Sequence, residues 1–127
     1  MIALPYALVV EGKYDLNKLS LLVSTPILKT DGFGVFRNRE TRALIRRYAT
    51  LGGLYLLTDP DGAGTLIRAH IRSIVPEDTR IIDLYVPKIE GKEKRKKAPG
   101  KEGLLGVEGM DTEYLGSLLE RYARPVS

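Results

Sequence analysis

The chain has 127 residues and a formal net charge of +4, with 43% hydrophobic and 28% charged residues. This length and composition predict a single globular domain over residues 1–127 and argue against a disordered or membrane-embedded chain. Because there is no cysteine and only one histidine, disulfides, thiolate metal sites, a cysteine nucleophile and a multi-histidine zinc site within one chain are all excluded.

The first ten residues, MIALPYALVV, carry no charged side chain. They are too few to span a bilayer, lack a basic leader and contain Pro5, so they are typical of a buried strand rather than of a membrane segment. We expect this strand at residues 6–10, ending at Glu11-Gly12, and we expect a cytoplasmic protein without membrane contacts.

Helical spacing follows the first strand, and Asp15 is expected to cap this helix at its N-terminus. A second short strand is predicted at residues 27–30, which stops at Asp31-Gly32. Residues 32–34 have too little periodicity to indicate a helix or a strand and are predicted to form a loop. The apolar positions of the first helix are Leu16, Leu19, Leu22 and Val23.

Residues 39–50 return to helical spacing and end at Gly52-Gly53, a typical helix stop. One face of this helix is apolar and the other carries arginines. A third buried strand is predicted at residues 54–58, and it runs directly into the turn Asp59-Pro60-Asp61-Gly62. The arginines of the helix are Arg39, Arg42 and Arg46.

A third helix ends at Pro76, a fourth strand is predicted at residues 81–86, and a final helix is indicated from Leu115 to Tyr122. Residues 88–103 are by composition a basic loop. Its first 14 residues, 88–101, hold a local charge of +5, so the rest of the chain sums to −1. This distribution favours a polyanionic partner, with a solvated loop as the alternative. The basic side chains expected to contact nucleic-acid phosphates are Lys88, Lys92, Lys94, Arg95, Lys96, Lys97 and Lys101.

Strands that alternate with helices predict an α/β fold, with a mostly parallel sheet of about four strands covered by helices on both faces. Ligands of such sheets bind beyond the carboxyl ends of the strands. If the first and third strands are neighbours, as in the order 2-1-3-4, then Glu11, Asp59 and Asp61 converge at one edge of the sheet.

Three carboxylates held close together repel one another, so they require a hard cation or a raised pKa. Oxygen ligands without histidine or cysteine suit Mg²⁺, with Mn²⁺ as the alternative. Gly62 and Gly64 allow close backbone approach, and the helix N-terminus that follows favours a phosphate. An Asp-Pro-Asp-Gly string is also a common turn, which is the competing structural interpretation.

Several segments resemble a known family. VVEGKYD (residues 9–15), the Thr30-Asp31-Gly32 turn and LLTDPDGAG (residues 56–64) resemble the Toprim domain of topoisomerases, primases and some nucleases. The VPK segment at residues 86–88, the basic loop and GVEGM at residues 106–110 are similar to the ribonuclease M5 family, Toprim ribonucleases that mature 5S ribosomal RNA. The resemblance covers the chain from about residue 6 to about residue 122, although Gly109 stands where that family usually has histidine.

The resemblance implies a Rossmann-like Toprim fold and a metal-dependent endoribonuclease that hydrolyses phosphodiester bonds with Mg²⁺. Asp59 and Asp61 would be metal ligands, and Glu11 would be a further ligand or a general acid/base. Lys13 would stabilise the negative charge that develops on the scissile phosphate, and Glu108 would be an additional acid. The implied partners are RNA, with the 5S ribosomal RNA precursor as the candidate, and a ribosomal protein.

Two other functions are compatible with the sequence. One is a Toprim module that binds RNA without cutting it. The other is a phosphotransfer receiver, which has a similar length and also carries an aspartate after its third strand. A receiver requires an acidic pair after the first strand, where this chain has Glu11-Gly12-Lys13.

Overall fold

The computed structural model describes residues 1–59, 62–85 and 112–123. Within them, β1 (Ala7–Val10), β2 (Ile27–Lys29), β3 (Gly53–Leu57) and β4 (Arg80–Leu84) form one sheet. The strand order is β2-β1-β3-β4, and every neighbouring pair is parallel. This confirms the predicted α/β class, and it meets the condition, set by the sequence argument, that the first and third strands are neighbours.

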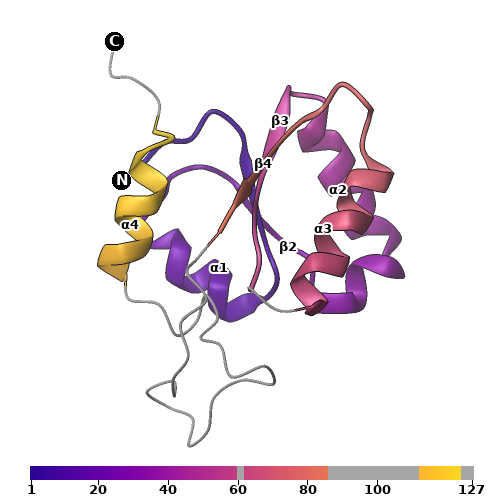
Figure 1. Ribbon diagram of the computed structural model, residues 1–127, viewed down its shortest axis with the longest axis horizontal. Coiled ribbons are helices and arrows are strands. Elements are labelled where there is room, and N and C mark those ends of the chain that lie inside the picture. The colour runs from indigo at the N-terminus through magenta and orange to yellow at the C-terminus, as the bar shows by residue number, and fades with distance from the viewer. Residues whose placement is uncertain (60–61, 86–111, 124–127) are drawn as a thin grey trace, which may run out of the picture.

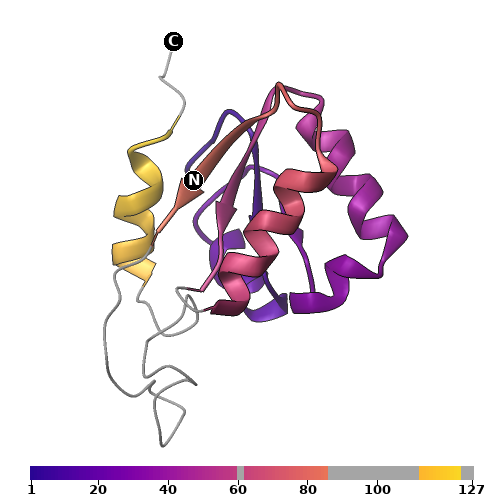
Figure 2. The same cartoon turned by 45° about the vertical axis from the view of Figure 1, so that its right-hand side comes forward.

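Helices cover both faces of the sheet (Figure 1). One face packs against α1 (Lys13–Ser20) and α4 (Thr112–Glu120). The other face packs against α2 (Arg39–Ala49), α3 (Gly62–Ile74) and the short 3₁₀ helix η1 (Gly32–Phe36). Figure 2 shows the two layers from the side, with α4 and α3 on opposite sides of the strands.

The central strands β1 and β3 are buried along their whole length, because helices cover the sheet on both sides. Their side chains alternate between the two faces, as a strand requires. Leu8 and Val10 pack in the cluster under α1 and α4, whereas Ala7 and Val9 pack in the cluster under α2 and α3. The ends of β1 and β3 are therefore held in place by packing on both faces.

A tyrosine cluster joins the end of α4 to the sheet. Tyr55 of β3 is 2% exposed, and its ring centroid lies 5.9 Å from that of Tyr6 and 5.5 Å from that of Tyr122. Burial raises the pKa of the Tyr55 phenol, because the charged form would lose its hydration. The edge-to-face contact between Tyr55 and Tyr122 fixes the chain directly after α4.

Two local expectations are wrong. Asp15 is not the N-cap of α1, which is Gly12; the Oδ2 atom of Asp15 accepts a hydrogen bond from the Gly12 N–H at 3.1 Å. The Asp15 carboxylate, in the first turn of α1, therefore accepts a hydrogen bond from a backbone N–H group at the start of the helix. Residues 32–34 are not a loop but begin η1, which follows Asp31 in a left-handed conformation with φ 56°. A 3₁₀ helix this short has no apolar periodicity by which a sequence could reveal it.

Some of the predicted features lie outside the described residues. They are Asp61, Glu108 and the basic loop at residues 88–103. Within the described ranges, none of the helices has the length and apolar character needed to cross a bilayer.

Candidate active site

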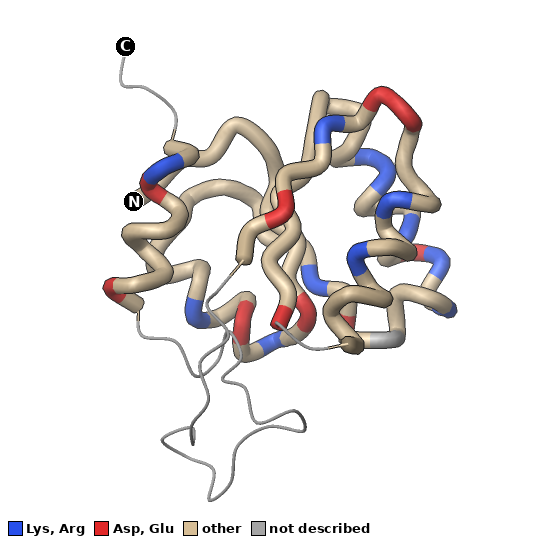
Figure 3. The backbone as a smooth tube through the Cα atoms, viewed as in Figure 1, with Lys and Arg blue, Asp and Glu red and all other residues tan. Residues whose placement is uncertain are grey.

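Glu11 and Asp59 lie at the same edge of the sheet. Glu11 follows β1 directly, and Asp59 is the second residue after β3. The two strands are parallel neighbours, with Val9 of β1 opposite Leu56 of β3, so their carboxyl ends leave the sheet together. Figure 3 shows acidic and basic positions side by side along this edge of the sheet.

A hydrogen bond joins the two segments that carry these acids. The Oε1 atom of Glu11 accepts from the backbone N–H of Asp59 at 2.9 Å, although the residues are 48 positions apart in the chain. A carboxylate has two oxygens and can accept several hydrogen bonds. The contact therefore orients Glu11 toward the aspartate segment.

The main chain of Glu11 is fixed as well. Its carbonyl oxygen accepts from the Gly32 N–H at 3.0 Å and from the Thr30 hydroxyl at 3.3 Å. Thr30 is itself fully buried at the end of β2. The Thr30-Asp31-Gly32 turn thus closes around Glu11, so that β2, β1 and β3 all contribute to the position of this acid.

The first turn of α3 packs directly on the two acids. A Cβ atom added to Gly64 would lie 2.2 Å from the Asp59 carbonyl oxygen, 2.9 Å from the Thr58 hydroxyl and 3.2 Å from Oε1 of Glu11. These distances allow only glycine at this position. The close backbone approach predicted for Gly64 is confirmed, and it brings the positive end of the α3 dipole to this edge of the sheet.

Lys13 is the first residue of α1, two positions after Glu11, and its side chain is exposed to solvent. An exposed ammonium beside an acidic site can meet an anionic ligand from solution. The structure thus brings Glu11 together with the Asp59 segment, and Lys13 lies two positions after Glu11 in the chain. The other predicted members of the site, Asp61 and Glu108, lie outside the described residues.

The chemistry of these donors suits a hard divalent cation. Glu11 and Asp59 offer carboxylate oxygens, the ligands that Mg²⁺ and Mn²⁺ prefer. In the part of the chain that the structure describes, no three acidic or histidine side chains are grouped as a metal site. Asp61 would be the third acid of the predicted set.

Sequence reasoning missed Arg68, a buried cation next to the candidate site. It lies on α3 and is 7% exposed. Its Nε atom donates to the Thr58 hydroxyl at 2.8 Å, and its Nη2 atom donates to the Leu84 carbonyl at 2.6 Å. Its Nη1 atom donates to the Asp83 carboxylate at 2.7 Å and to the Leu56 carbonyl at 3.2 Å.

These bonds tie α3 to the end of β4 and to the end of β3, where Thr58 directly precedes Asp59. A signal for Arg68 exists in the sequence, because it occupies an inward position next to Ile67 and one turn from Gly64 and Ile71. An arginine on the buried stripe of a helix indicates a charged or carbonyl partner inside the fold.

We expect the Arg68→Leu variant to lose about 3–5 kcal/mol of unfolding free energy, since it leaves buried carbonyl and hydroxyl groups without their donor. Urea denaturation measures this loss. The matched control is Arg72→Leu, because Arg72 pairs with the same Asp83 carboxylate but has a 45% exposed side chain. The control should cost at most about 1 kcal/mol. Equal losses in the two variants would contradict a structural role for the buried guanidinium.

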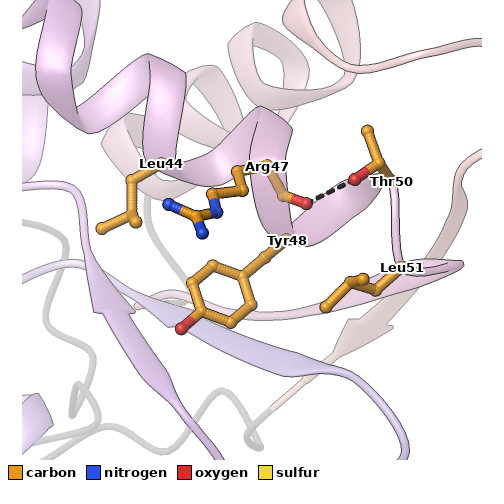
Figure 4. Close-up of a pocket in the computed structure, with 5 residues that line it drawn as sticks. All are labelled: Leu44, Arg47, Tyr48, Thr50 and Leu51. Carbon is orange, nitrogen blue, oxygen red and sulfur yellow. Dashed lines mark hydrogen bonds between the residues drawn. The ribbon is translucent and has the colours of Figure 1, made fainter.

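Two pockets formed by described residues lie away from the acids. One of about 490 Å³ lies at the C-terminal end of α2, between Leu44, Tyr48 and Leu51 (Figure 4). The Thr50 hydroxyl donates to the Arg47 carbonyl at its rim, at 2.6 Å. Because these residues precede β3, the pocket lies at the opposite edge of the sheet from Glu11.

Fold and site together describe a parallel α/β protein with two acids, Glu11 and Asp59, at the carboxyl edge of its central strands. By sequence, the chain resembles ribonuclease M5. No family model matches it. It is 30% identical over 114 residues to ribonuclease M5 of Fusobacterium nucleatum, which covers 90% of this chain and 56% of that protein.

Two further relatives carry the same name. Ribonuclease M5 of Staphylococcus aureus is 32% identical over 118 residues, 93% of this chain and 60% of that protein. Ribonuclease M5 of Lactiplantibacillus plantarum is 38% identical over 102 residues, 80% of this chain and 49% of that protein. The similarity thus covers most of this chain, whereas the chain spans about half the length of the curated relatives it matches.

Proposed function

We propose that this protein is a Mg²⁺-dependent endoribonuclease of the Toprim type, with its active site at the carboxyl edge of β1 and β3. The observation that carries the proposal is the bond from the Asp59 N–H to the Glu11 carboxylate. It joins Glu11 to the segment that carries Asp59, although the two are distant in the chain, which supports a shared role for these acids in phosphodiester hydrolysis. The similarity to proteins named ribonuclease M5 supports RNA as the substrate.

The residues have separate roles in this proposal. Asp59 and Asp61 would hold Mg²⁺, which when bound polarises the phosphate and stabilises charge as the bond breaks. Glu11 takes or gives a proton at the attacking water or the leaving oxygen, or shares in holding the ion. Its carboxylate is kept in position by the Asp59 N–H and its main chain by the Thr30 turn.

Two groups of basic residues complete the proposal. Lys13 reaches the scissile phosphate from the start of α1 and stabilises its negative charge. The basic side chains of the loop at residues 88–103 bind the RNA backbone, which compensates for the repulsion between RNA and the acids. We further propose that the substrate is the 5S ribosomal RNA precursor and that the enzyme acts together with a ribosomal protein. We also propose a cytoplasmic location. The substrate and the protein partner follow from the resemblance described above.

The purified protein is expected to produce new RNA ends in total RNA with Mg²⁺ and none with EDTA. Mapping those ends by sequencing identifies the substrate and the cleavage position. The Glu11→Gln variant, incubated in parallel, controls for contaminating nucleases because it should produce no new ends. A protein that shifts labelled precursor RNA in a gel but leaves it uncut in Mg²⁺ would replace this proposal by the binding module.

A further inference from the structure

A buried cation holds the side chain directly before Asp59. Thr58 follows β3, precedes Asp59 in the chain and is 1% exposed. Its hydroxyl oxygen accepts a hydrogen bond from the Nε atom of Arg68 at 2.8 Å, and this bond is buried. A Cβ atom on Gly64 would lie 2.9 Å from the same oxygen, so the first turn of α3 also lies against it. Two parts of α3 therefore confine the Thr58 side chain.

The guanidinium that bonds to Thr58 is itself fixed. Arg68 donates through Nη1 to the Asp83 carboxylate at 2.7 Å, and through Nη1 and Nη2 to one backbone carbonyl each of β3 and β4. The ring of Tyr85 lies against it, with its centroid 4.7 Å from the guanidinium carbon. Because a guanidinium is planar and its N–H groups form a rigid fork, these bonds also fix the direction of its Nε–H group.

The same segment is bonded to Glu11. The N–H group that donates to Oε1 of Glu11 at 2.9 Å belongs to the peptide group between Thr58 and Asp59. A peptide group is planar, so a rotation of the Thr58 backbone would turn this N–H group away from the carboxylate. The Arg68 bond restricts such a rotation, because it holds the Thr58 side chain in place.

We infer that Arg68 is a positioning residue for the proposed reaction. Through the Thr58 hydroxyl, it holds the Asp59 backbone where its N–H group meets Glu11. The inference rests on the proposed function for the reaction that these acids perform. A displacement of about 1 Å in a catalytic group can lower a rate by about 10²-fold. Loss of this one buried bond is therefore expected to slow cleavage, although Arg68 takes no part in the chemistry.

The test changes the acceptor of the bond, because Arg68→Leu is itself expected to be strongly destabilised. Thr58→Val replaces the hydroxyl by a methyl group of similar size and leaves the Arg68 Nε–H group without this acceptor. Thr58→Ser is the matched variant, since it keeps the hydroxyl and loses only the methyl group. Urea denaturation measures the general loss of stability in both variants.

Amide hydrogen exchange, followed by NMR in EDTA, reports on the Asp59 backbone without RNA or metal. The Asp59 amide is expected to exchange about 10-fold faster in Thr58→Val than in Thr58→Ser, because the segment opens more often without the Arg68 bond. The Leu8 amide is the reference for opening of the central sheet, since it donates to the Pro26 carbonyl at 3.0 Å. Any increase at Leu8 should be smaller than the increase at Asp59.

Single-turnover cleavage with Mg²⁺ measures the consequence for the reaction. Thr58→Val should lower the cleavage rate by about 10²-fold, whereas Thr58→Ser should remain within about threefold of the wild type. Thr58 is 1% exposed, so it is shielded from RNA. Gel shifts of labelled precursor RNA in EDTA should therefore give the same affinity for both variants, which places the loss in the cleavage step.

Equal exchange of the Asp59 amide in the two Thr58 variants would overturn the inference. Equal cleavage rates of the two variants would also overturn it, and the proposed function would stand because the protein cuts RNA. A wild type that cuts no RNA would instead refute the proposed function. Amide exchange alone would then decide whether Arg68 holds the Asp59 backbone.

Discussion

Replacing Glu11 by glutamine is expected to lower the RNA cleavage rate by about 10²–10⁴-fold while the protein remains folded. The amide keeps an oxygen that can accept the hydrogen bond from the Asp59 N–H, which is 2.9 Å long with Glu11 in place. It cannot carry the negative charge or take up the proton that the proposed mechanism needs. We therefore expect the unfolding free energy to change by less than about 1 kcal/mol.

Single-turnover cleavage and urea denaturation, measured on the same preparations, test this separation of activity from stability. Asp59→Asn should behave like Glu11→Gln. Asp31→Asn is the matched control, because it removes a carboxylate at the same edge, where Asp31 pairs with Lys29 at 3.3 Å on the surface. Asparagine also tolerates the left-handed conformation of residue 31. Normal cleavage by either purified variant would remove the acid that it replaces from the mechanism.

A single added methyl group at Gly64 is expected to abolish most of the activity. The new Cβ would lie 2.2 Å from the Asp59 carbonyl oxygen, a backbone atom that cannot rotate away. Either α3 or the segment after β3 must move, and Glu11 lies against the same position. Overpacking of this kind costs about 1–3 kcal/mol of stability. A displacement of about 1 Å in a catalytic group can lower the rate by about 10²-fold.

Two other glycines distinguish damage to the site from general destabilisation. A Cβ at Gly53 would lie 2.5 Å from the Arg80 carbonyl oxygen, also a backbone atom, but at the opposite end of β3. Gly53→Ala should therefore lose stability and keep its cleavage rate per folded molecule. Gly116 has open space around it on α4, so Gly116→Ala should gain up to about 1 kcal/mol. If Gly53→Ala lost as much cleavage as Gly64→Ala at equal stability, the clash at the acids would not be the cause.

The sheet could be predicted from sequence because its central strands are buried on both faces. Such strands are continuous apolar runs, and β1 and β3 match the predicted runs at residues 6–10 and 54–58 within one residue at each end. The alternation with amphipathic helices then restricts the connections to right-handed crossovers, so few topologies remain. The pairing of β1 with β3, which the sequence argument left as a condition, is found in the structure.

The local errors have a common physical origin. Asp15 and Asn38 are both residues that favour helix N-termini, yet only Asn38 is an N-cap, with its Oδ1 atom accepting from the Thr41 N–H at 3.0 Å. Asp15 instead bonds backward to Gly12 from the first turn. Such choices depend on where the preceding strand releases the chain, which the residue type does not specify.

By itself, the sequence determined the strands and the α-helices, the parallel sheet and the positions of Glu11 and Asp59 at strand ends, but not η1, because hydrophobic periodicity and turn residues act over short distances. Only the tertiary structure decided which atoms meet at that edge. The bond between Glu11 and Asp59 spans 48 residues, and the Arg68 side chain joins α3 to the ends of two strands and supports Tyr85. Contacts of this kind arise when packing closes long stretches of chain, so no local pattern encodes them.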